Sequence, residues 1–408
     1  MTERYFAPCP RGLEQPLATE LAALRATDIV AAEGGVGFAG DRDLAYHANL
    51  ESRIASRILW RVGGAPYRNE HDLYSLVRAI DWARHFKPGR TLRVDVAAST
   101  RRAAPRVESA PGGQRSGSTS VEGSRSVSPL ASLEFATLRV KDAVCDRFRD
   151  DCGVRPSVDK RAPDVRVHVH LTERDASVYV DTSGEPLFKR GYRRDADEAP
   201  LRENLAAGLL ALAQWTPERM LLDPMCGSGT IVAEAAQIAA DRAPGLARTF
   251  GFQKLAWYDG PTWQRIRQRA HDRVRTAPGA ITIVGSDVAP AAVARTSSTL
   301  RAAQVGAFAR VEEANVLTRA APGESGVALA NPPYGVRLAD AGQMATFYPQ
   351  LGDALKRRFS GWTAGLFTGD LRLAKLIGLK PERRIPLWNG AIECRLYLFR
   401  LVEGSMRR

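Results

Sequence analysis

The sequence predicts a doubly wound α/β domain in the C-terminal half of the chain, preceded by a smaller α+β region. From Leu201 onward, short apolar runs alternate with segments of helical periodicity, which is typical of a parallel sheet with helices on both faces. A turn containing Gly227 and Gly229 follows the first apolar run. The last two runs meet at Asn389-Gly390, which suits a type I′ hairpin turn because both central residues need positive φ.

The composition favours a soluble protein that binds a polyanion. The 408 residues are enough for two or three domains, and no apolar run of about 20 residues or basic-apolar leader is visible, so we expect a cytoplasmic protein without a membrane span. None of the five cysteines forms a CxxC pair, so we expect no metal site. The net charge of +13 favours a nucleic acid partner, although an arginine-rich composition would give the same charge.

The N-terminal half contains α+β signals and one low-complexity segment. Helices are expected over 12–24 and 133–148, and strands over 92–97, 165–171 and 177–181. His168 and His170 share a strand face, but no third ligand lies near them in the sequence, so we interpret them as surface residues. Residues 101–129 are rich in Ser, Gly and Pro and lack periodicity, so we expect a disordered loop there.

The C-terminal elements alternate in a regular order. We expect a helix over 202–214, a strand over 219–223, a helix over 228–240, a long connection over 241–279 with a basic helix over 264–275, a strand over 280–285, a helix over 290–303, strands over 307–313 and 326–330, a helix over 343–359, a strand over 363–368, and a final strand pair over 383–388 and 391–401.

The segment from Asp223 to Thr230, DPMCGSGT, joins the first strand of this domain to its helix. Its glycines allow a sharp turn and a close approach to a ligand, and the segment is neither a Walker loop nor GxGxxG. Asp287 ends the next strand, where a carboxylate can accept both ribose hydroxyls or cap the following helix. Asn315 ends the third strand and can accept a hydrogen bond from an adenine amino group.

The DPMCGSGT string resembles the first motif of S-adenosylmethionine-dependent methyltransferases that act on amino groups. The resemblance implies that the loop contacts the methionyl part of this cofactor, with Asp223 near its amino group; the implied contacts are Asp223, Pro224, Cys226, Gly227, Ser228 and Gly229. A nucleophilic role for Cys226 is rejected, because enzymes that attack a pyrimidine ring carry Pro-Cys after the fourth strand. We interpret Cys226 as a small buried side chain.

Asn331-Pro332-Pro333-Tyr334 follows the fourth strand, at the sheet edge where doubly wound domains bind ligands. An exocyclic amine is a poor nucleophile because its lone pair is delocalised. Asn331 and the Pro332 carbonyl can accept its two N–H bonds and so localise the lone pair, while Tyr334 can stack on the base. Alone, the motif leaves adenine N6, cytosine N4, guanine N2 and glutamine amides open.

The whole chain except the low-complexity loop resembles RNA methyltransferases with a THUMP domain, and is most similar to the guanine-N2 half of bifunctional bacterial 23S rRNA methyltransferases. The stretches that carry the resemblance are FATLRVKDA (135–143), RPSVD (155–159), DTSGEPL (181–187), KRGYR (189–193), APLRENLA (199–206) and NPPYG (331–335).

The resemblance implies a ferredoxin-like segment over 1–62, a THUMP domain over 63–182, a linker over 183–200 and a class I methyltransferase domain over 201–408. The expected RNA contacts are Lys189, Arg190, Arg193 and Pro333. The chain departs from the pattern in its longer 101–129 segment, in Asn315 where relatives carry Asp, and in the absence of a second methyltransferase half.

We therefore expect a monomeric enzyme that transfers a methyl group from S-adenosylmethionine to guanine N2 in RNA, with 23S rRNA as the expected substrate. A tRNA guanine-N2 enzyme remains open. A DNA adenine-N6 methyltransferase is disfavoured by the THUMP-like half. An inactive RNA-binding protein is disfavoured by Gly227, Gly229, Asp287 and Asn331.

Overall fold

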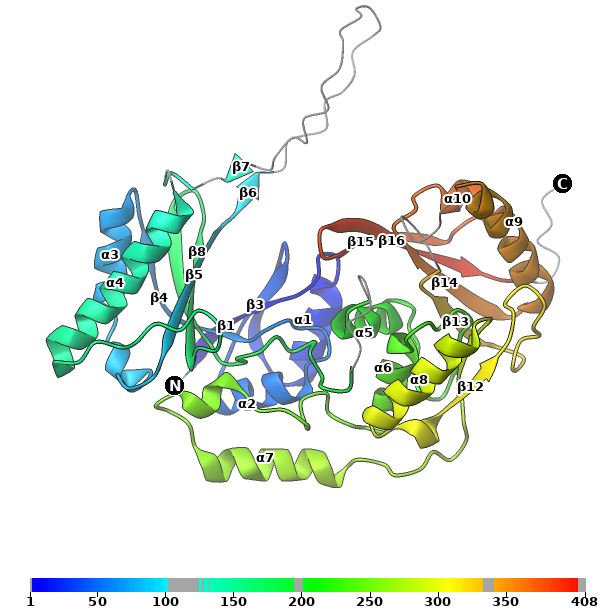
Figure 1. The fold of residues 1–408 in the computed structure, drawn as a ribbon, viewed down its shortest axis with the longest axis horizontal. Coiled ribbons are helices and arrows are strands. Elements are labelled where there is room, and N and C mark those ends of the chain that lie inside the picture. The colour runs from blue at the N-terminus through cyan, green and yellow to red at the C-terminus, as the bar shows by residue number, and fades with distance from the viewer. Residues whose placement is uncertain are drawn as a thin grey trace, which may run out of the picture. The chain divides into compact units, whose positions relative to one another are not determined.

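The structure, a computed structural model, describes residues 2–101, 125–126, 128–130, 132–193, 201–332 and 341–402 (Figure 1). The chain divides into two compact units. Unit 1 contains residues 1–58, 185–250 and 259–408, and unit 2 contains residues 59–184 and 251–258. In the part that the structure describes, no helix is long and apolar enough to cross a membrane.

A seven-stranded sheet forms the C-terminal part of unit 1, in the order β12-β11-β10-β13-β14-β16-β15. The first five of these strands are parallel, and β16 is antiparallel to both of its neighbours. The strands are β10 (Met220–Asp223), β11 (Ile283–Asp287), β12 (Ala309–Glu313), β13 (Gly326–Ala330), β14 (Trp362–Thr368), β15 (Arg383–Asn389) and β16 (Ile392–Arg400). The predicted doubly wound sheet with a closing antiparallel hairpin is confirmed.

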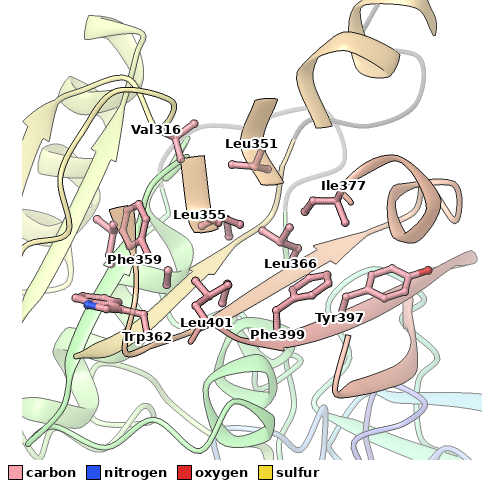
Figure 2. Packing of buried hydrophobic residues seen from close by; sticks show 14 of the residues in the cluster. Val316, Leu351, Leu355, Phe359, Trp362, Leu366, Ile377, Tyr397, Phe399 and Leu401 are labelled. Atoms are coloured by element: carbon pink, nitrogen blue, oxygen red, sulfur yellow. The ribbon is translucent and has the colours of Figure 1, made fainter. Parts of the chain in front are cut away.

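Six helices accompany this sheet in the described residues: α5 (Glu203–Leu212), α6 (Thr230–Ala239), α7 (Gly260–Asp272), α8 (Pro290–Ala302), α9 (Ala341–Arg358) and α10 (Leu373–Leu376). Figure 2 shows Leu351 and Leu355 of α9, with Phe359 directly after the helix, in the same buried cluster as side chains of β14 and β16; the three residues are four positions apart. The ring nitrogen of Trp362 donates to the Gly323 carbonyl at 3.0 Å, so this large side chain is buried without losing its hydrogen bond.

The closing hairpin differs from the prediction in its turn. Asn389 pairs with Ile392, so the two loop residues are Gly390 and Ala391 rather than Asn389 and Gly390. Of these residues only Gly390 has a positive φ, 65°. A positive φ confined to the first loop residue fits a type II′ turn, which requires glycine there.

Three antiparallel strands and two helices form the N-terminal part of unit 1: β1 (Glu3–Pro8), α1 (Glu14–Ala23), β2 (Thr27–Ala32), β3 (Gly35–Gly40) and α2 (Arg42–Glu51). Strand β3 pairs with both β1 and β2. Helix α1 was predicted, whereas the strands and α2 were not. Asp41 caps α2 by accepting from the Leu44 amide at 2.8 Å.

Unit 2 contains the strands β4 (Leu59–Pro66), β9 (Asp175–Asp181), β8 (Val165–Leu171) and β5 (Leu92–Ala98), which neighbour one another in this order. Helices α3 (Glu70–Arg78) and α4 (Leu133–Cys152) pack together in the same unit. Most of the predicted loop over 101–129 lies outside the described residues. At its ends, Thr100–Arg101 (β6) pairs with Arg125–Ser126 (β7).

A short segment from the C-terminal half, residues 251–258, completes unit 2. We call it the insertion segment. The Phe252 amide donates to the Thr182 carbonyl and the Ala256 amide to the His85 carbonyl, both at 2.8 Å. Lys254 forms an ion pair with Asp164 at 2.7 Å. The chain therefore passes between the two units four times.

Candidate active site

The carboxyl ends of β10 and β13 lie side by side, because these strands are parallel neighbours in register, with Leu222 opposite Ala328. The strand order reverses here, since β11 and β12 continue on one side of β10 while β13 and β14 continue on the other. Such a reversal is where doubly wound sheets bind ligands. The topology brings together the predicted cofactor loop after β10 and the predicted base motif after β13.

Hydrogen bonds from two neighbouring elements hold the loop after β10. The Gly227 amide donates to the carboxylate of Asp287, at the end of β11, at 3.0 Å. From α8, the Thr296 hydroxyl donates to the Gly227 carbonyl at 3.1 Å and the Thr299 hydroxyl to the Ser228 carbonyl at 2.9 Å. The loop backbone is therefore held in one conformation by side chains.

The two loop glycines meet different surroundings. Both have positive φ, 55° at Gly227 and 79° at Gly229, which favours glycine. A Cβ on Gly229 would lie 3.0 Å from the Cα of Thr296, so α8 approaches too closely for a side chain. A Cβ on Gly227 would meet nothing within 4 Å. Gly227 thus faces open space in which a ligand can approach the backbone.

Asp223 is 2% exposed, and the described residues place no cation within ion-pair distance of it. Its carboxylate accepts from the Met225 amide at 3.3 Å. Burial, with a smaller contribution from Asp287, raises the pKa of Asp223 to about 8. A buried carboxylate lacking a counter-ion fits a ligand that brings an ammonium group.

Asp287 uses both carboxylate oxygens. One accepts from the Gly227 amide and the other from the Ala289 amide, each at 3.0 Å. The N-cap position of α8 is Ala289, so Asp287 lies two residues before the N-cap and accepts from its amide. Each oxygen keeps a lone pair for a further donor, such as a ribose hydroxyl.

Cys226 is 6% exposed, and its sulfur lies 3.3 Å from the Thr296 hydroxyl oxygen. Burial, followed by the nearby Asp223 carboxyl, raises the pKa of the thiol to about 12. A thiol that stays protonated is a poor nucleophile. These surroundings support a packing role for Cys226.

Asn315 and a residue that sequence reasoning missed lie beyond β12. Asn315 is exposed, and its side-chain oxygen accepts from the Leu317 amide at 2.9 Å. Arg319, whose side chain is 8% exposed, donates to the Ser286 hydroxyl at 2.7 Å and pairs with Glu312 at 2.8 Å. Arg319 therefore joins the ends of β11 and β12. No motif marks it, because Ser286 lies 33 residues away.

The Asn331 side-chain oxygen is buried and has no hydrogen-bond partner in the described part of the chain. A buried unsatisfied acceptor costs about 1–3 kcal/mol, and an N–H donor from a ligand would recover this energy. Pro332 is buried beside it. Pro333 and Tyr334 lie outside the described residues.

The basic residues proposed to contact RNA differ in exposure. Lys189 is exposed and pairs with Glu185 at 2.7 Å. Arg193 donates to the Leu201 carbonyl and the Thr230 hydroxyl, both at 2.9 Å.

The structure places Arg190 in the interior instead, with 3% exposure. Its guanidinium donates to the Leu187 and Arg53 carbonyls at 2.6 and 2.5 Å and reaches Glu234 at 3.4 Å. This side chain connects the 185–193 segment, the turn after α2 and α6, and is not available to a partner.

The two strand histidines lie in unit 2. His168 lies 3.9 Å from the buried carboxylate of Asp181, and the His170 ring lies 3.1 Å from the Ser99 hydroxyl. Within the described residues, no group of three or more His, Cys, Asp or Glu side chains is arranged to hold a metal ion.

The switch point between β10 and β13, the glycine loop and the antiparallel closing hairpin define a class I methyltransferase domain. Residues 190–397 match the family described as RMKL-like, methyltransferase domain, and the chain belongs to this family. Residues 67–181 match the THUMP domain, and residues 4–59 match the RlmL ferredoxin-like domain. The resemblance to THUMP-containing methyltransferases is confirmed.

Several curated relatives share the name ribosomal RNA large subunit methyltransferase K/L. The chain is 37% identical to the protein of Cellvibrio japonicus, covering 98% of this chain and 51% of the relative. It is 38% identical to that of Syntrophotalea carbinolica, covering 98% and 54%. The chain thus spans about half the length of the curated relatives it matches.

Solved structures with similar folds cover nearly the whole chain. SMU.472, described as a candidate methyltransferase and crystallised with SAH, is 27% identical, with a TM-score of 0.83 and coverage of 100% of this chain and 99% of that one. A protein of Listeria monocytogenes described as a predicted N6-adenine-specific DNA methylase is 26% identical, with a TM-score of 0.83 and coverage of 98% and 97%.

Proposed function

We propose that this protein transfers a methyl group from S-adenosylmethionine to the N2 amine of a guanine in RNA, with large-subunit ribosomal RNA as the substrate. The observation that carries the proposal is the unsatisfied Asn331 oxygen at the sheet edge beside the Asp223–Gly229 loop. Support for the RNA comes from the relatives named ribosomal RNA large subunit methyltransferase K/L and from the THUMP match.

The residues around the loop fit this cofactor, which supplies a sulfonium-activated methyl group when bound. The buried Asp223 would pair with its α-ammonium group, and Gly227 leaves room for the methionyl chain. Pro224, Cys226, Ser228 and Gly229 shape the same loop. Asp287 has lone pairs for the ribose hydroxyls, and Asn315, whose side-chain oxygen accepts from the Leu317 amide, would contact the adenine.

At the base, Asn331 and the Pro332 carbonyl would accept the two N–H bonds of the amine. These acceptors favour a pyramidal nitrogen whose lone pair points at the methyl group, so they stabilise the transition state more than the ground state. Tyr334 would stack on the base. The methylated nitrogen can lose its proton to water, so no strong base is needed.

For the RNA, we propose a ferredoxin-like segment over 1–62, a THUMP domain over 63–182, a connection over 183–200 and a catalytic domain over 201–408. Lys189, Arg193 and Pro333 would contact the substrate near the catalytic domain. Arg190 is omitted because of its burial. A monomer in the cytoplasm would suit an enzyme acting on ribosomal RNA.

A second candidate is adenine-N6 methylation of DNA. The Listeria monocytogenes structure described as an N6-adenine-specific DNA methylase favours it, because an Asn-Pro-Pro-Tyr motif also suits an adenine amine. A tRNA guanine-N2 activity would use the same site chemistry.

One experiment separates these functions. The full chain is incubated with labelled S-adenosylmethionine and, in parallel, with unmodified ribosomal RNA, total tRNA or duplex DNA, and the product is digested to nucleosides. We expect label in N2-methylguanosine from ribosomal RNA. Label in N6-methyladenosine would move the protein to the second candidate, and label only in tRNA would change the substrate.

A further inference from the structure

Helix α7 lies in the long connection between α6 and β11, outside the strand–helix alternation of the domain (Figure 1). One face anchors it to unit 1. The ring of Trp263 lies 6.0 Å from that of Tyr46 on α2 and 5.6 Å from that of Phe250. The Asp259 amide donates to the Tyr46 hydroxyl at 2.9 Å. The helix is thus held on its buried side and leaves the other side to solvent.

The solvent side of this region is basic. The helix contains three arginines and one acidic residue, Asp272, and further arginines follow it; all five arginines are exposed: Arg265, Arg267, Arg269, Arg273 and Arg275. Arg265, Arg269 and Arg273 are four residues apart, so they form a row along one flank with a spacing of about 6 Å.

The arginines of this row differ in their partners. Arg273 forms ion pairs with Glu51 and Asp241. Arg265 donates to the hydroxyl of Thr262 at 2.7 Å. Across the described ranges, no carboxylate lies within ion-pair distance of Arg265 or Arg269. Like charges four residues apart on a helix repel each other, so this pair favours a bound anion.

We propose that Arg265 and Arg269 form a contact surface for the phosphate backbone of the substrate RNA. RNA is a polyanion that can neutralise both side chains at once, and the guanidinium fork matches a phosphate group. Contacts to phosphates hold a nucleic acid without reading its bases, which suits a row of exposed arginines. The inference depends on the proposed function in one respect, namely that the substrate is RNA.

The test compares two double variants in the full chain. Arg265→Gln with Arg269→Gln removes the proposed contacts. Arg357→Gln with Arg358→Gln removes the same charge from exposed positions on α9 of the same unit, and Arg357, like Arg265, donates to an acceptor on its own helix, the Asp353 carbonyl. Affinity for a fluorescein-labelled RNA hairpin is measured between about 50 and 200 mM salt.

We expect the α7 variant to make the slope of log K against log salt shallower by about 1.4–1.8, since each lost phosphate contact removes about 0.7–0.9. The α9 variant should keep the wild-type slope. An unchanged slope in the α7 variant, or an equal change in both variants, would overturn the inference. The hairpin assay contains no cofactor, so it does not depend on methyl transfer. The proposed function is tested separately, by calorimetry with S-adenosylmethionine alone and by methyl transfer with the wild type.

Discussion

At the scale of single residues, the Asp223 carboxyl should couple cofactor binding to pH. Its pKa is raised to about 8, so the folded protein without ligand holds this proton over a range where an unfolded Asp has lost it. Stability therefore falls as pH rises from about 4 to about 8. An ammonium ligand favours the ionised form, so affinity for S-adenosylmethionine should rise with pH up to about 8, approaching tenfold per unit.

The measurement is calorimetric affinity at several pH values for the wild type and Asp223→Asn. The variant should bind weakly and without the pH trend, because its amide does not titrate. A wild-type affinity that stays flat between about pH 6 and 8 would show that Asp223 is not the partner of the ammonium group.

The orphaned Asn331 oxygen leads to a second prediction. Asn331→Ala should lower turnover by about 100- to 1000-fold, the usual effect of removing one preorganised transition-state partner. Cofactor affinity should stay near the wild-type value, because no hydrogen bond joins the Asn331 side-chain oxygen to the described cofactor loop. Single-turnover assays with saturating RNA and cofactor measure this, with Asn331→Asp, which keeps an acceptor oxygen, as the milder variant. A normal rate for the alanine variant would make the motif a purely structural loop.

At the scale of an element, substitutions of the two glycines in the loop after β10 should have different effects, one on folding and the other on ligand binding. Gly229→Ala places a Cβ against α8, which should lower the free energy of unfolding by about 1–3 kcal/mol. A Cβ at position 227 meets nothing within 4 Å, so we expect Gly227→Leu to cost chiefly the positive φ, about 1–2 kcal/mol, while filling the room that the ligand needs.

Thermal unfolding and calorimetry on both variants check this difference. Gly227→Leu should stay folded and lose S-adenosylmethionine binding, with Gly227→Ala as the control for backbone strain. If Gly227→Leu binds the cofactor like the wild type, the open space beside Gly227 is not the binding site.

The success of sequence analysis also varied by element. The central strands of the C-terminal sheet, β10, β11, β13 and β14, were predicted because each is a short, largely buried apolar run, as in β13, whose five residues are all buried. The N-terminal strands lack this signal. Strand β2 is almost entirely exposed, and β3 contains three glycines, which weaken any strand pattern. The hairpin was predicted, but its turn was displaced by one residue.

The residues of the candidate site also differ in how well the local sequence predicts them. Asp223, Gly227 and Asn331 could be proposed from the sequence because each belongs to a contiguous motif at the end of a strand. Arg190 and Arg319 owe their positions to residues far away in sequence: Arg190 lies 44 residues from Glu234 and 137 from Arg53. From the sequence alone, Arg190 was expected to be exposed, because most arginines are. Its burial is visible only in the tertiary structure.

At the scale of the whole molecule, the boundary between the two units falls just before the insertion segment, between two phenylalanines that are close in the sequence. Phe252 is fully buried in unit 2, whereas Phe250, 3% exposed, packs against Trp263 in unit 1. Phe252→Ala should therefore destabilise unit 2 and Phe250→Ala unit 1, each by about 3–5 kcal/mol.

Hydrogen exchange distinguishes the two outcomes. Phe252→Ala should increase exchange in β8 and β9, which belong to unit 2, and leave β10 and β13 protected; Phe250→Ala should do the reverse. If both variants loosen the same strands, the two units do not unfold separately. A fragment ending before residue 251 would lack part of unit 2, so full-length variants are the better test.

The contacts of the first 58 residues also bear on synthesis by the ribosome. Arg273 pairs with Glu51 across 222 residues, and the Asp259 amide reaches Tyr46 across 213. At about 5–20 residues per second, the N-terminal segment waits roughly 10–40 s for these partners to be translated. The nascent chain therefore carries an unfinished surface of unit 1 through much of translation, and chaperones that bind exposed apolar segments have their longest access to it during that interval.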